Sequence, residues 1–309
     1  MNMLLLGATG QLGQSFIEQG GLATLGTLST ASRRGQDYAG RRCEAADLSQ
    51  PDSLPALLDQ LRPQLIVNAA AYTAVDRAEQ EEALATRVNG QALGVLGRWA
   101  AAHGALVLHY STDYVFDGAA QAPYPVDAPT QPVGAYGRSK LAGERALKES
   151  GAAHLIFRTA WVYAAHGQNF LRTMLRLGTE RAELRVVADQ HGTPTSTDLI
   201  VRASLQALAR YRSLDTEARC QLQGVHHLVA SGQTTWHGFA EAIFDEALQR
   251  GLLPRRPRVW PITTAEFPTP AKRPAWSVLD TAECTRRFEI TLVDWRSELQ
   301  AVIGKLAQP

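Results

Sequence analysis

The chain has 309 residues, and 31 Lys and Arg stand against 30 Asp and Glu, which gives a formal net charge of +1. This balance excludes an overall field that would attract nucleic acid, and no apolar run approaches the roughly 20 residues that span a bilayer. The three cysteines, Cys43, Cys220 and Cys284, are widely spaced and indicate neither a disulfide framework nor a zinc site. We therefore expect a cytoplasmic protein with no nucleic-acid partner, no membrane partner and no metal.

The first half of the chain alternates short apolar runs with helical patterns. Leu54, Leu57, Leu58 and Leu61, for example, follow the helical spacing of three and four residues. The predicted strands are 3–6, 23–28, 65–67, 105–110 and 154–158, and the predicted helices are 12–19, 54–61, 81–103 and a segment around residue 136. Repeated strand–helix units of this length predict an α/β fold with a Rossmann-type, doubly wound parallel sheet.

The second half is less regular. Helices are predicted at 170–177, 198–211 and 235–250, strands at 184–187 and 226–229, and an irregular Pro- and Arg-rich stretch at 253–275. No linker divides the chain cleanly. We expect an NAD(P)-binding domain over 1–163 plus roughly 190–225, and a smaller, discontinuous substrate-binding lobe over 164–189 and 226–309.

Gly7, Gly10 and Gly13 follow the first predicted strand directly and lead into a helix. Glycines at this turn let backbone amides approach a pyrophosphate, and the N-terminus of the helix favours its negative charge. The spacing is the variant used by short-chain dehydrogenases/reductases. It predicts a dinucleotide site, although a glycine-rich turn that binds nothing is the other interpretation.

The choice of cofactor depends on the end of the second strand. An acidic residue there would favour NAD by binding the adenosine ribose, but residues 29–34 contain no acid and end in Arg33 and Arg34. This favours the 2′-phosphate of NADPH, with NADH as the alternative if both arginines belong to a solvated loop. Further contacts are predicted with the adenine, by Asp47 and Leu48, and along the cofactor where the small residues Ala69, Ala70 and Ala71 end a strand.

Tyr136 and Lys140 are four residues apart, so on a helix they share one face. A phenol beside an ammonium group can donate a proton to a ketone oxygen, because the positive charge favours the phenolate and lowers the pKa of the phenol. Thr112 ends the preceding strand, and its hydroxyl can polarise the same oxygen. We predict Tyr136 as the general acid, Lys140 as its partner and Thr112 as the carbonyl anchor. Asn89, on the long helix, is a candidate holder of a relay water.

Six segments carry a family resemblance: 67–76 (VNAAAYTAVD), 111–118 (STDYVFDG), 158–163 (RTAWVY), 189–195 (DQHGTPT), 227–232 (HLVASG) and 269–274 (TPAKRP). They resemble the dTDP-4-dehydrorhamnose reductase family of extended short-chain dehydrogenases/reductases, over nearly the whole chain. The resemblance implies reduction of the 4-keto group of dTDP-4-dehydro-β-L-rhamnose to dTDP-L-rhamnose, the last step in making that sugar nucleotide.

The resemblance also implies roles for individual residues. By motif position Tyr136 is the proton donor, Thr112 and Asp113 contact the sugar, and Trp161 packs against it. The implied cofactor contacts are Gln11, Leu12, Asp47, Leu48, Ala71, Tyr72, Thr73, Tyr136 and Lys140. Asn169, Gln190 and Arg273 are further substrate candidates. Trp161 as a core aromatic and Arg273 as a solvated residue are the alternatives.

Some relatives bind a divalent metal through acidic residues at a dimer contact. Near those positions this chain has Ser15 and Asp198, which weakens the case for a metal-bridged dimer, and we expect a monomer or weak homodimer. Two other functions stay open. One is a reductase or epimerase for another nucleotide sugar, and the other is a dinucleotide-binding regulatory subunit like the β subunit of methionine adenosyltransferase.

Overall fold

A seven-stranded parallel sheet forms the centre of the computed structural model, which describes residues 1–308. The strand order is β11-β6-β5-β4-β1-β2-β3. These strands are β1 (Asn2–Leu6), β2 (Thr27–Ser32), β3 (Cys43–Ala45), β4 (Leu65–Asn68), β5 (Leu106–Thr112), β6 (Ala153–Thr159) and β11 (Gly224–His227). The chain winds outward in both directions from the β1–β4 pair, which confirms the predicted α/β class and its doubly wound parallel sheet.

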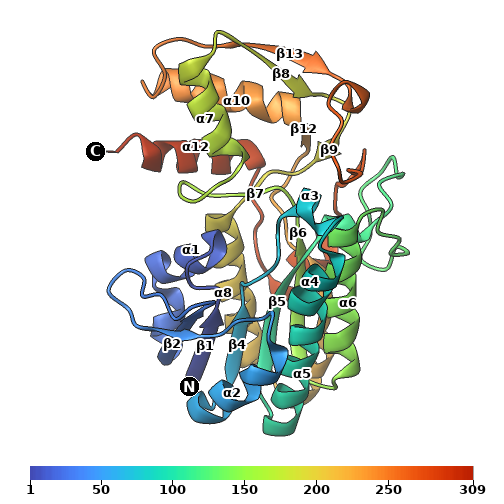
Figure 1. Cartoon of the computed structure of the whole chain (residues 1–309). Helices are drawn as coiled ribbons and strands as arrows, with labels where there is room; N and C mark the ends of the chain where they lie inside the picture. Colours follow the sequence, from blue (N-terminus) through green and yellow to red (C-terminus); the bar gives the residue numbers. More distant parts are fainter. Residues whose placement is uncertain (309) are drawn as a thin grey trace.

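Alternate side chains of β1 enter two different cores, because successive residues of a strand point to opposite faces. Met3 and Leu5 join a cluster with α1 (Gln11–Gln19) and α8 (Thr197–Ser213). Leu4 and Leu6 join a second cluster with α2 (Leu54–Leu61), α5 (Ala92–His103) and α6 (Ala135–Glu149). Both faces of the sheet are therefore covered by helices, as Figure 1 shows.

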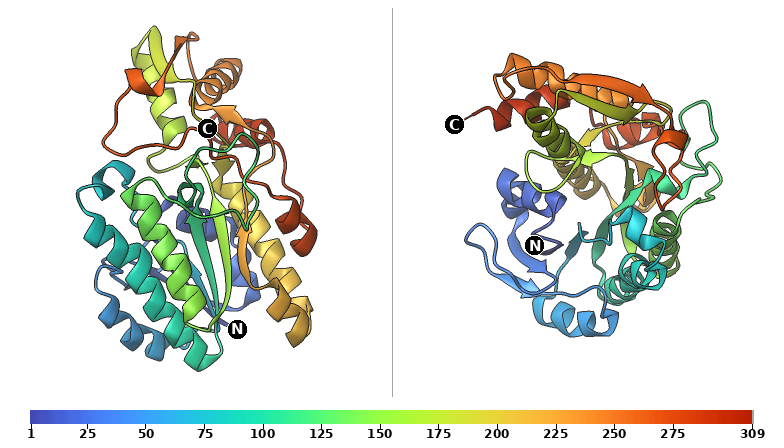
Figure 2. Two further views of the ribbon diagram at one scale, coloured as in Figure 1. Left: turned by 90° about the vertical axis from the view of Figure 1, so that its right-hand side faces the viewer. Right: turned by 45° about the horizontal axis from the view of Figure 1, so that its top comes forward.

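A smaller lobe lies beyond one end of the sheet (Figures 1 and 2). It contains α7 (Phe170–Glu180), α10 (Trp236–Gln249), α12 (Trp295–Leu306) and the parallel pair β8 (Glu183–Val187) and β13 (Arg258–Ile262). Two short pairs join β7 (Val162–Tyr163) to β10 (Thr195–Ser196) and β9 (His191–Gly192) to β12 (Thr234–Thr235). Over residues 1–308, no helix is both long and apolar enough to cross a membrane.

Three of the expected elements differ in the structure. The strand expected at 23–28 is wrong, because Gly21–Leu25 forms a 3-10 turn and β2 begins only at Thr27. The helix expected at 81–103 is interrupted, since α4 (Glu82–Thr86) and α5 are joined by a π-helical segment, Arg87–Gln91. The stretch 253–275 is not irregular throughout, because it contains β13 and pairs with β8.

The predicted division into two domains stays a prediction. Strand β11 belongs to the large sheet through His227, two residues past the boundary expected at 225. Helix α11 (Ala282–Phe288) packs against β11 and α8. The remaining short helices are α3 (Val75–Ala78) and α9 (Thr216–Leu222), and 3-10 turns lie at Pro51–Ser53, Asp113–Val115 and Thr264–Glu266.

Candidate active site

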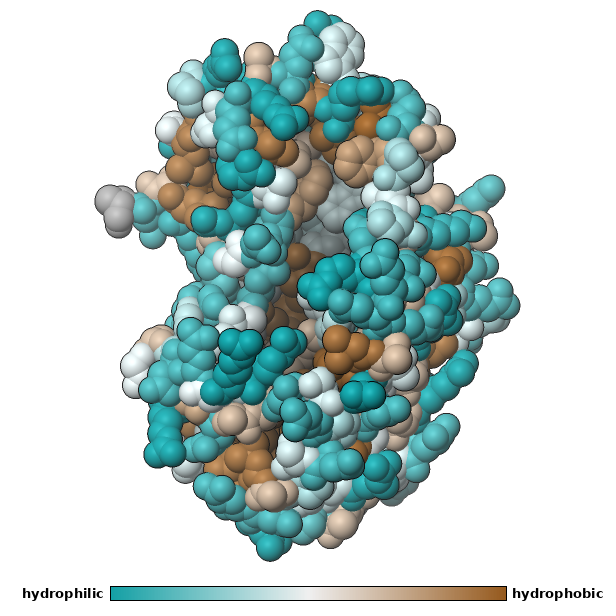
Figure 3. Space-filling view, viewed as in Figure 1, coloured by the Kyte–Doolittle hydropathy of each residue, from teal (hydrophilic) through white to brown (hydrophobic). Residues whose placement is uncertain are grey.

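A cleft of about 800 Å³ lies where the carboxyl ends of the sheet strands meet the smaller lobe. Figure 3 shows a furrow across this face of the molecule, with hydrophobic surface inside it and hydrophilic rims. The sheet order reverses at the β1–β4 pair, and the loops that follow these two strands form part of the cleft wall. Doubly wound sheets bind their ligands at this position.

The glycine loop lines the cleft next to β4. Gly7 has a left-handed φ of 80°, and a Cβ there would lie 2.7 Å from the backbone nitrogen of Ala70. Gly10 caps α1 without a side-chain hydrogen bond, so the first N–H groups of this helix are free to bind an anion. Gly10, Gln11 and Leu12 line the cleft, whereas Gly13 packs behind it, where a Cβ would lie 2.1 Å from the carbonyl oxygen of Gly7. The loop therefore fits a dinucleotide pyrophosphate.

We call the part of the cleft near the end of β2 the adenosine end. Arg33 and Arg34 line it and are exposed, and neither forms an ion pair with a carboxylate within residues 1–308. Asp47 and Leu48 also line it, and the Asp47 carboxylate accepts a hydrogen bond of 2.9 Å from the backbone nitrogen of Ser49. Two unpaired guanidinium groups at this position fit a phosphate on the adenosine ribose.

The middle of the cleft is lined by Ala69, Ala70, Ala71 and Thr73, but not by Tyr72. The Tyr72 phenol points away and donates to Glu81 at 2.6 Å. The Asn89 side chain is hydrogen-bonded to the backbone of Tyr72: its Oδ1 accepts from the Tyr72 nitrogen at 2.8 Å, and its Nδ2 donates to the Tyr72 carbonyl oxygen at 3.0 Å. Nδ2 also donates to Ser139 Oγ at 2.9 Å. The Asn89 side chain is thus fully engaged within the protein, which does not support the relay water expected there.

The reactive end of the cleft is formed by Thr112, at the end of β5, and by Tyr136 and Lys140 on α6. Desolvation raises the pKa of Tyr136, and the Thr112 hydroxyl opposes this effect. The lowering that we expected from Lys140 is not found. A raised pKa keeps the phenol protonated near neutral pH, which is the form that a proton donor needs.

Lys140 is buried at the reactive end of the cleft. Its Nζ donates to the backbone oxygen of Tyr110 at 2.6 Å and lies 3.2 Å from Nε2 of His109. Burial lowers the pKa of Lys140 to about 8, and the charge of Glu144 opposes the shift. The ammonium form therefore dominates at neutral pH but by a small margin.

Two buried oxygens at the reactive end have no hydrogen-bond partner among the described residues: Asp113 Oδ2 and Thr159 Oγ1. Both residues line the cleft, and Thr159 pairs with Thr112 across the β5–β6 ladder. Burial raises the pKa of Asp113 to about 6. Buried polar atoms without partners are rare in folded proteins, so these two oxygens indicate where a polar ligand binds.

Trp161 lies on the smaller-lobe side of the cleft, with a left-handed φ of 46°. Its ring stacks on Trp236 at 3.6 Å between centroids. Gln190 does not line the cleft; its Oε1 accepts from Trp236 Nε1 at 3.2 Å, and its Nε2 donates to Thr264 at 3.0 Å. Gln190 therefore supports the indole stack, and the stack presents a flat apolar surface to a ligand.

Arg273 lines the cleft and forms an ion pair of 2.9 Å with Asp76. Hydrogen bonding and charge link Arg273 to Tyr114, whose pKa burial raises to about 12. The Tyr114 ring in turn meets Tyr136 edge to face, with centroids 5.8 Å apart. A cation is thus available near the reactive end for a diphosphate or a sugar oxygen.

Asn169 lies outside the cleft lining and holds a loop against α1. Its Nδ2 donates to Gln11 Oε1 at 2.7 Å, and its Oδ1 caps α7 by accepting from Arg172. His166, in the same loop, lies 3.0 Å from the carbonyl oxygen of Gln11. The loop between β7 and α7 is thereby fastened to the turn that carries the glycines.

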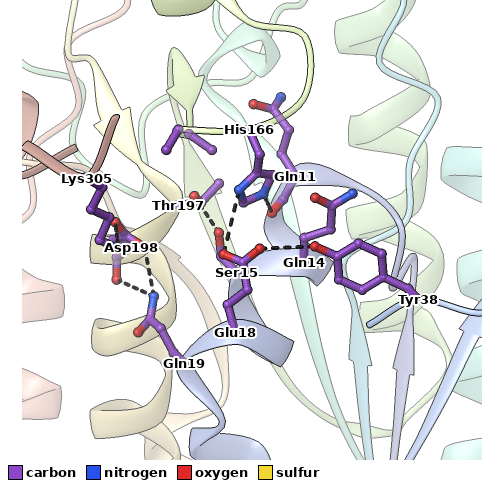
Figure 4. A network of polar contacts seen from close by, with 12 residues as sticks. Gln11, Gln14, Ser15, Glu18, Gln19, Tyr38, His166, Thr197, Asp198 and Lys305 are labelled. Carbon is purple, nitrogen blue, oxygen red and sulfur yellow. Dashed lines mark hydrogen bonds and ion pairs between the residues drawn. The ribbon is translucent and has the colours of Figure 1, made fainter. Parts of the chain in front are cut away.

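Figure 4 shows the polar contacts around α1, including those of Ser15 and Asp198. Ser15 Oγ donates to Thr197 at 2.7 Å, and Asp198 accepts from Gln19 at 3.1 Å and from Lys305 at 2.6 Å. Throughout residues 1–308, no group of three or more His, Cys, Asp or Glu side chains is arranged to hold a metal ion.

Sequence reasoning missed Tyr114, Trp236 and the place of His109 beside Lys140. Tyr114 follows Thr112 and Asp113 directly, and its place in the same segment was an available indication. Trp236 begins α10 of the smaller lobe and is distant from Trp161 in the sequence, so no local pattern pairs the two residues.

Comparison with known proteins identifies the family. The model of the RmlD substrate binding domain matches residues 1–308. A dTDP-4-dehydrorhamnose reductase of Burkholderia thailandensis is 46% identical over 300 residues, covering 96% of each chain. The Escherichia coli K12 protein of the same name is 41% identical over 306 residues, 99% of this chain and 98% of that protein.

Solved structures agree with these sequence matches. The dTDP-4-dehydrorhamnose reductase of Clostridium acetobutylicum superposes with a TM-score of 0.86, at 33% identity and with all of both chains covered. That of Bacillus anthracis, solved in complex with NADP, gives a TM-score of 0.84 at 30% identity over 98% of each chain. The chain therefore belongs to the RmlD family, the family of the dTDP-4-dehydrorhamnose reductases.

Proposed function

We propose that this chain reduces the 4-keto group of dTDP-4-dehydro-β-L-rhamnose with NADPH to give dTDP-L-rhamnose. The observation that carries the proposal is the meeting of Thr112, Tyr136 and Lys140 in one cleft with the glycine loop. Family membership supports the substrate, and the NADP complex of the Bacillus anthracis relative supports the cofactor. Arg33 and Arg34 at the adenosine end, which pair with no carboxylate among the described residues, support NADPH over NADH.

NADPH, when bound, supplies the hydride that reaches the ketone carbon. The Tyr136 phenol donates a proton to the ketone oxygen. The Thr112 hydroxyl, which donates to Asp113 Oδ1 in this structure, turns to donate a hydrogen bond to the same ketone oxygen. Lys140 keeps a positive charge beside the phenol, which stabilises the phenolate left after proton transfer.

The substrate side of the proposal rests on Asp113, Trp161 and Arg273. We propose that Oδ2 of Asp113, which has no hydrogen-bond partner among the described residues, accepts from a sugar hydroxyl and that the Trp161 ring packs on the sugar. Arg273 is proposed to bind the diphosphate. Gln190 and Asn169 act indirectly, since their amides hold Trp236 and the glycine turn.

We further propose a cytoplasmic location, which the three free cysteines and the use of NADPH support. A monomer or weak homodimer stays a prediction.

The direct test mixes purified protein with the 4-keto sugar nucleotide and NADPH and follows the absorbance of the reduced nicotinamide. Oxidation of NADPH in step with formation of dTDP-L-rhamnose is the expected result. Binding of NADPH without turnover would contradict the reductase proposal and favour a regulatory, dinucleotide-binding role.

A further inference from the structure

The Thr159 hydroxyl is a buried group at the reactive end that the reaction proposed above does not use. Thr159 ends β6 and is 7% exposed, and its Oγ1 has no hydrogen-bond partner among the described residues. The residue nevertheless lines the cleft. Because a buried hydroxyl without a partner destabilises a fold, the partner of this hydroxyl is expected in a bound ligand.

Thr159 and Thr112 present their side chains to the same face of the sheet. The two residues are partners in the parallel ladder of β5 and β6, and the strands of such a ladder lie about 4.8 Å apart. Thr112 donates to Asp113 Oδ1, whereas the Thr159 hydroxyl binds no group of residues 1–308. The hydroxyl that is proposed to bind the ketone oxygen therefore has an unused hydroxyl beside it.

The order of the strands along the cleft places Thr159 on the sugar side. The proposed cofactor contacts of the sheet follow β3, β2, β1 and β4, and the proposed carbonyl anchor, Thr112, ends β5. Strand β6 is the next strand beyond β5, and Trp161, which is proposed to pack on the sugar, follows Thr159 by two residues. A ligand group that meets Thr159 therefore belongs to the sugar and not to the dinucleotide.

The chemistry of the keto sugar selects one of its groups. Of the two ring carbons beside the 4-keto group, C3 carries a hydroxyl and C5 carries a methyl group, so only the C3 substituent can hydrogen-bond to a threonine. Two oxygens on neighbouring ring carbons suit two hydroxyls on strands about 4.8 Å apart, with hydrogen bonds of about 2.8 Å each.

We propose that Thr159 is a substrate-binding residue: its hydroxyl donates to the C3 hydroxyl oxygen of the keto sugar while Thr112 holds the ketone oxygen. Two adjacent oxygens held by neighbouring strands fix the rotation of the sugar ring, and with it the face of C4 that the hydride reaches. This inference rests on the proposed function, since it names the part of the same substrate that Thr159 binds.

The test measures by calorimetry how dTDP-L-rhamnose and its 3-deoxy analogue bind to wild type and to Thr159→Val, each saturated with NADP⁺. Valine has nearly the shape of threonine but lacks the hydroxyl. The dissociation constant of dTDP-L-rhamnose should rise about tenfold in the variant, whereas that of the 3-deoxy analogue should stay within about twofold. Equal weakening of both sugars would overturn the proposal. Weaker NADPH binding with unchanged sugar binding would also overturn it, by assigning the hydroxyl to the nicotinamide.

Two further variants separate sugar binding from folding. Thr159→Ser keeps the hydroxyl and should bind dTDP-L-rhamnose within about threefold of wild type. Thr197→Val is the matched control, because Thr197 is also buried but accepts from Ser15 and does not line the cleft. The control should lower the unfolding temperature of the ligand-free protein and leave sugar binding unchanged.

Thr159→Val, in contrast, should unfold at the wild-type temperature or above, because it loses no hydrogen bond of the ligand-free protein. A drop as large as that of Thr197→Val would show a structural hydroxyl and overturn the proposal. A wild-type protein that binds NADPH but neither binds nor reduces the keto sugar nucleotide would instead refute the proposed function.

Discussion

At the reactive end of the cleft Lys140 and Asp113 are buried with shifted pKa values, whereas at the adenosine end Arg33 and Arg34 are exposed and form no ion pair within residues 1–308. Burial strengthens hydrogen bonds and charge interactions but disfavours charged groups. Exposed groups stay charged because they remain hydrated, but salt screens their interactions with other charges. The reactive end should therefore control kcat and its pH dependence, and its buried charges should lower the stability of the fold. The adenosine end should control the choice of cofactor, with little effect on kcat or on stability.

The largest effect is expected from Tyr136→Phe. Loss of the phenol hydroxyl removes the proposed proton donor, so kcat should fall by about 10²- to 10⁴-fold. The dissociation constant of NADPH, measured by fluorescence titration, should stay within about threefold of wild type because the ring remains.

Tyr114→Phe is the matched control for that variant. Its ring contacts Tyr136 edge to face and also lines the cleft, but its hydroxyl is linked to Arg273. The control should lose less than about tenfold in kcat. A kcat near the wild-type value in Tyr136→Phe would show that this phenol is not the proton donor. The proposal that the reactive end, unlike the adenosine end, controls the rate would then lose its main support.

Asp113→Asn should stabilise the folded protein while lowering its activity. The pKa of Asp113 is raised to about 6 in the folded protein, against about 3.9 in an unfolded chain. Ionisation therefore destabilises the folded state progressively as the pH rises from about 4 to 6, and the penalty reaches about 3 kcal/mol above that range. Asparagine carries no such penalty.

Urea unfolding should accordingly show that Asp113→Asn is more stable than wild type by up to about 3 kcal/mol at pH 8, and by about half as much at pH 5. Its kcat/KM should fall about tenfold, because the proposed acceptor for a sugar hydroxyl is weakened. Asp117→Asn is the control, since Asp117 lies outside the cleft lining and its pKa is lowered by the Tyr124 hydroxyl. A stability gain that does not change with pH would contradict the assigned cause.

The parts of the site that could be predicted from the sequence depend on local spacing. Tyr136 and Lys140 lie one helical turn apart, the glycines mark a strand–helix turn, and alternating apolar runs predicted the parallel sheet, which the structure confirms. The predicted family is confirmed too. These features are readable because each depends on backbone geometry over a few residues.

The features that could not be predicted depend on contacts between distant segments. Trp161 meets Trp236 only because the smaller lobe folds back over the sheet. The expected lowering of the Tyr136 pKa was wrong because desolvation, which no sequence pattern reports, raises this pKa, and only the Thr112 hydroxyl opposes the shift. Residues 23–25 were predicted to begin a strand, but they form the end of the 3-10 turn Gly21–Leu25, which is anchored by the burial of Leu22 in the large cluster.

The smallest effect on catalysis is expected from the double variant Arg33→Ala, Arg34→Ala. Its affinity for NADPH should fall about tenfold while its affinity for NADH stays nearly constant, because only NADPH carries a 2′-phosphate. Added salt should weaken NADPH binding to wild type and narrow this difference, since both arginines are exposed. Arg41→Ala, Arg42→Ala is the matched control, an exposed pair in the same loop region that does not line the cleft. Equal losses for both cofactors would place Arg33 and Arg34 outside the phosphate site, and a changed kcat with saturating NADPH would show that the two ends of the cleft are coupled rather than independent.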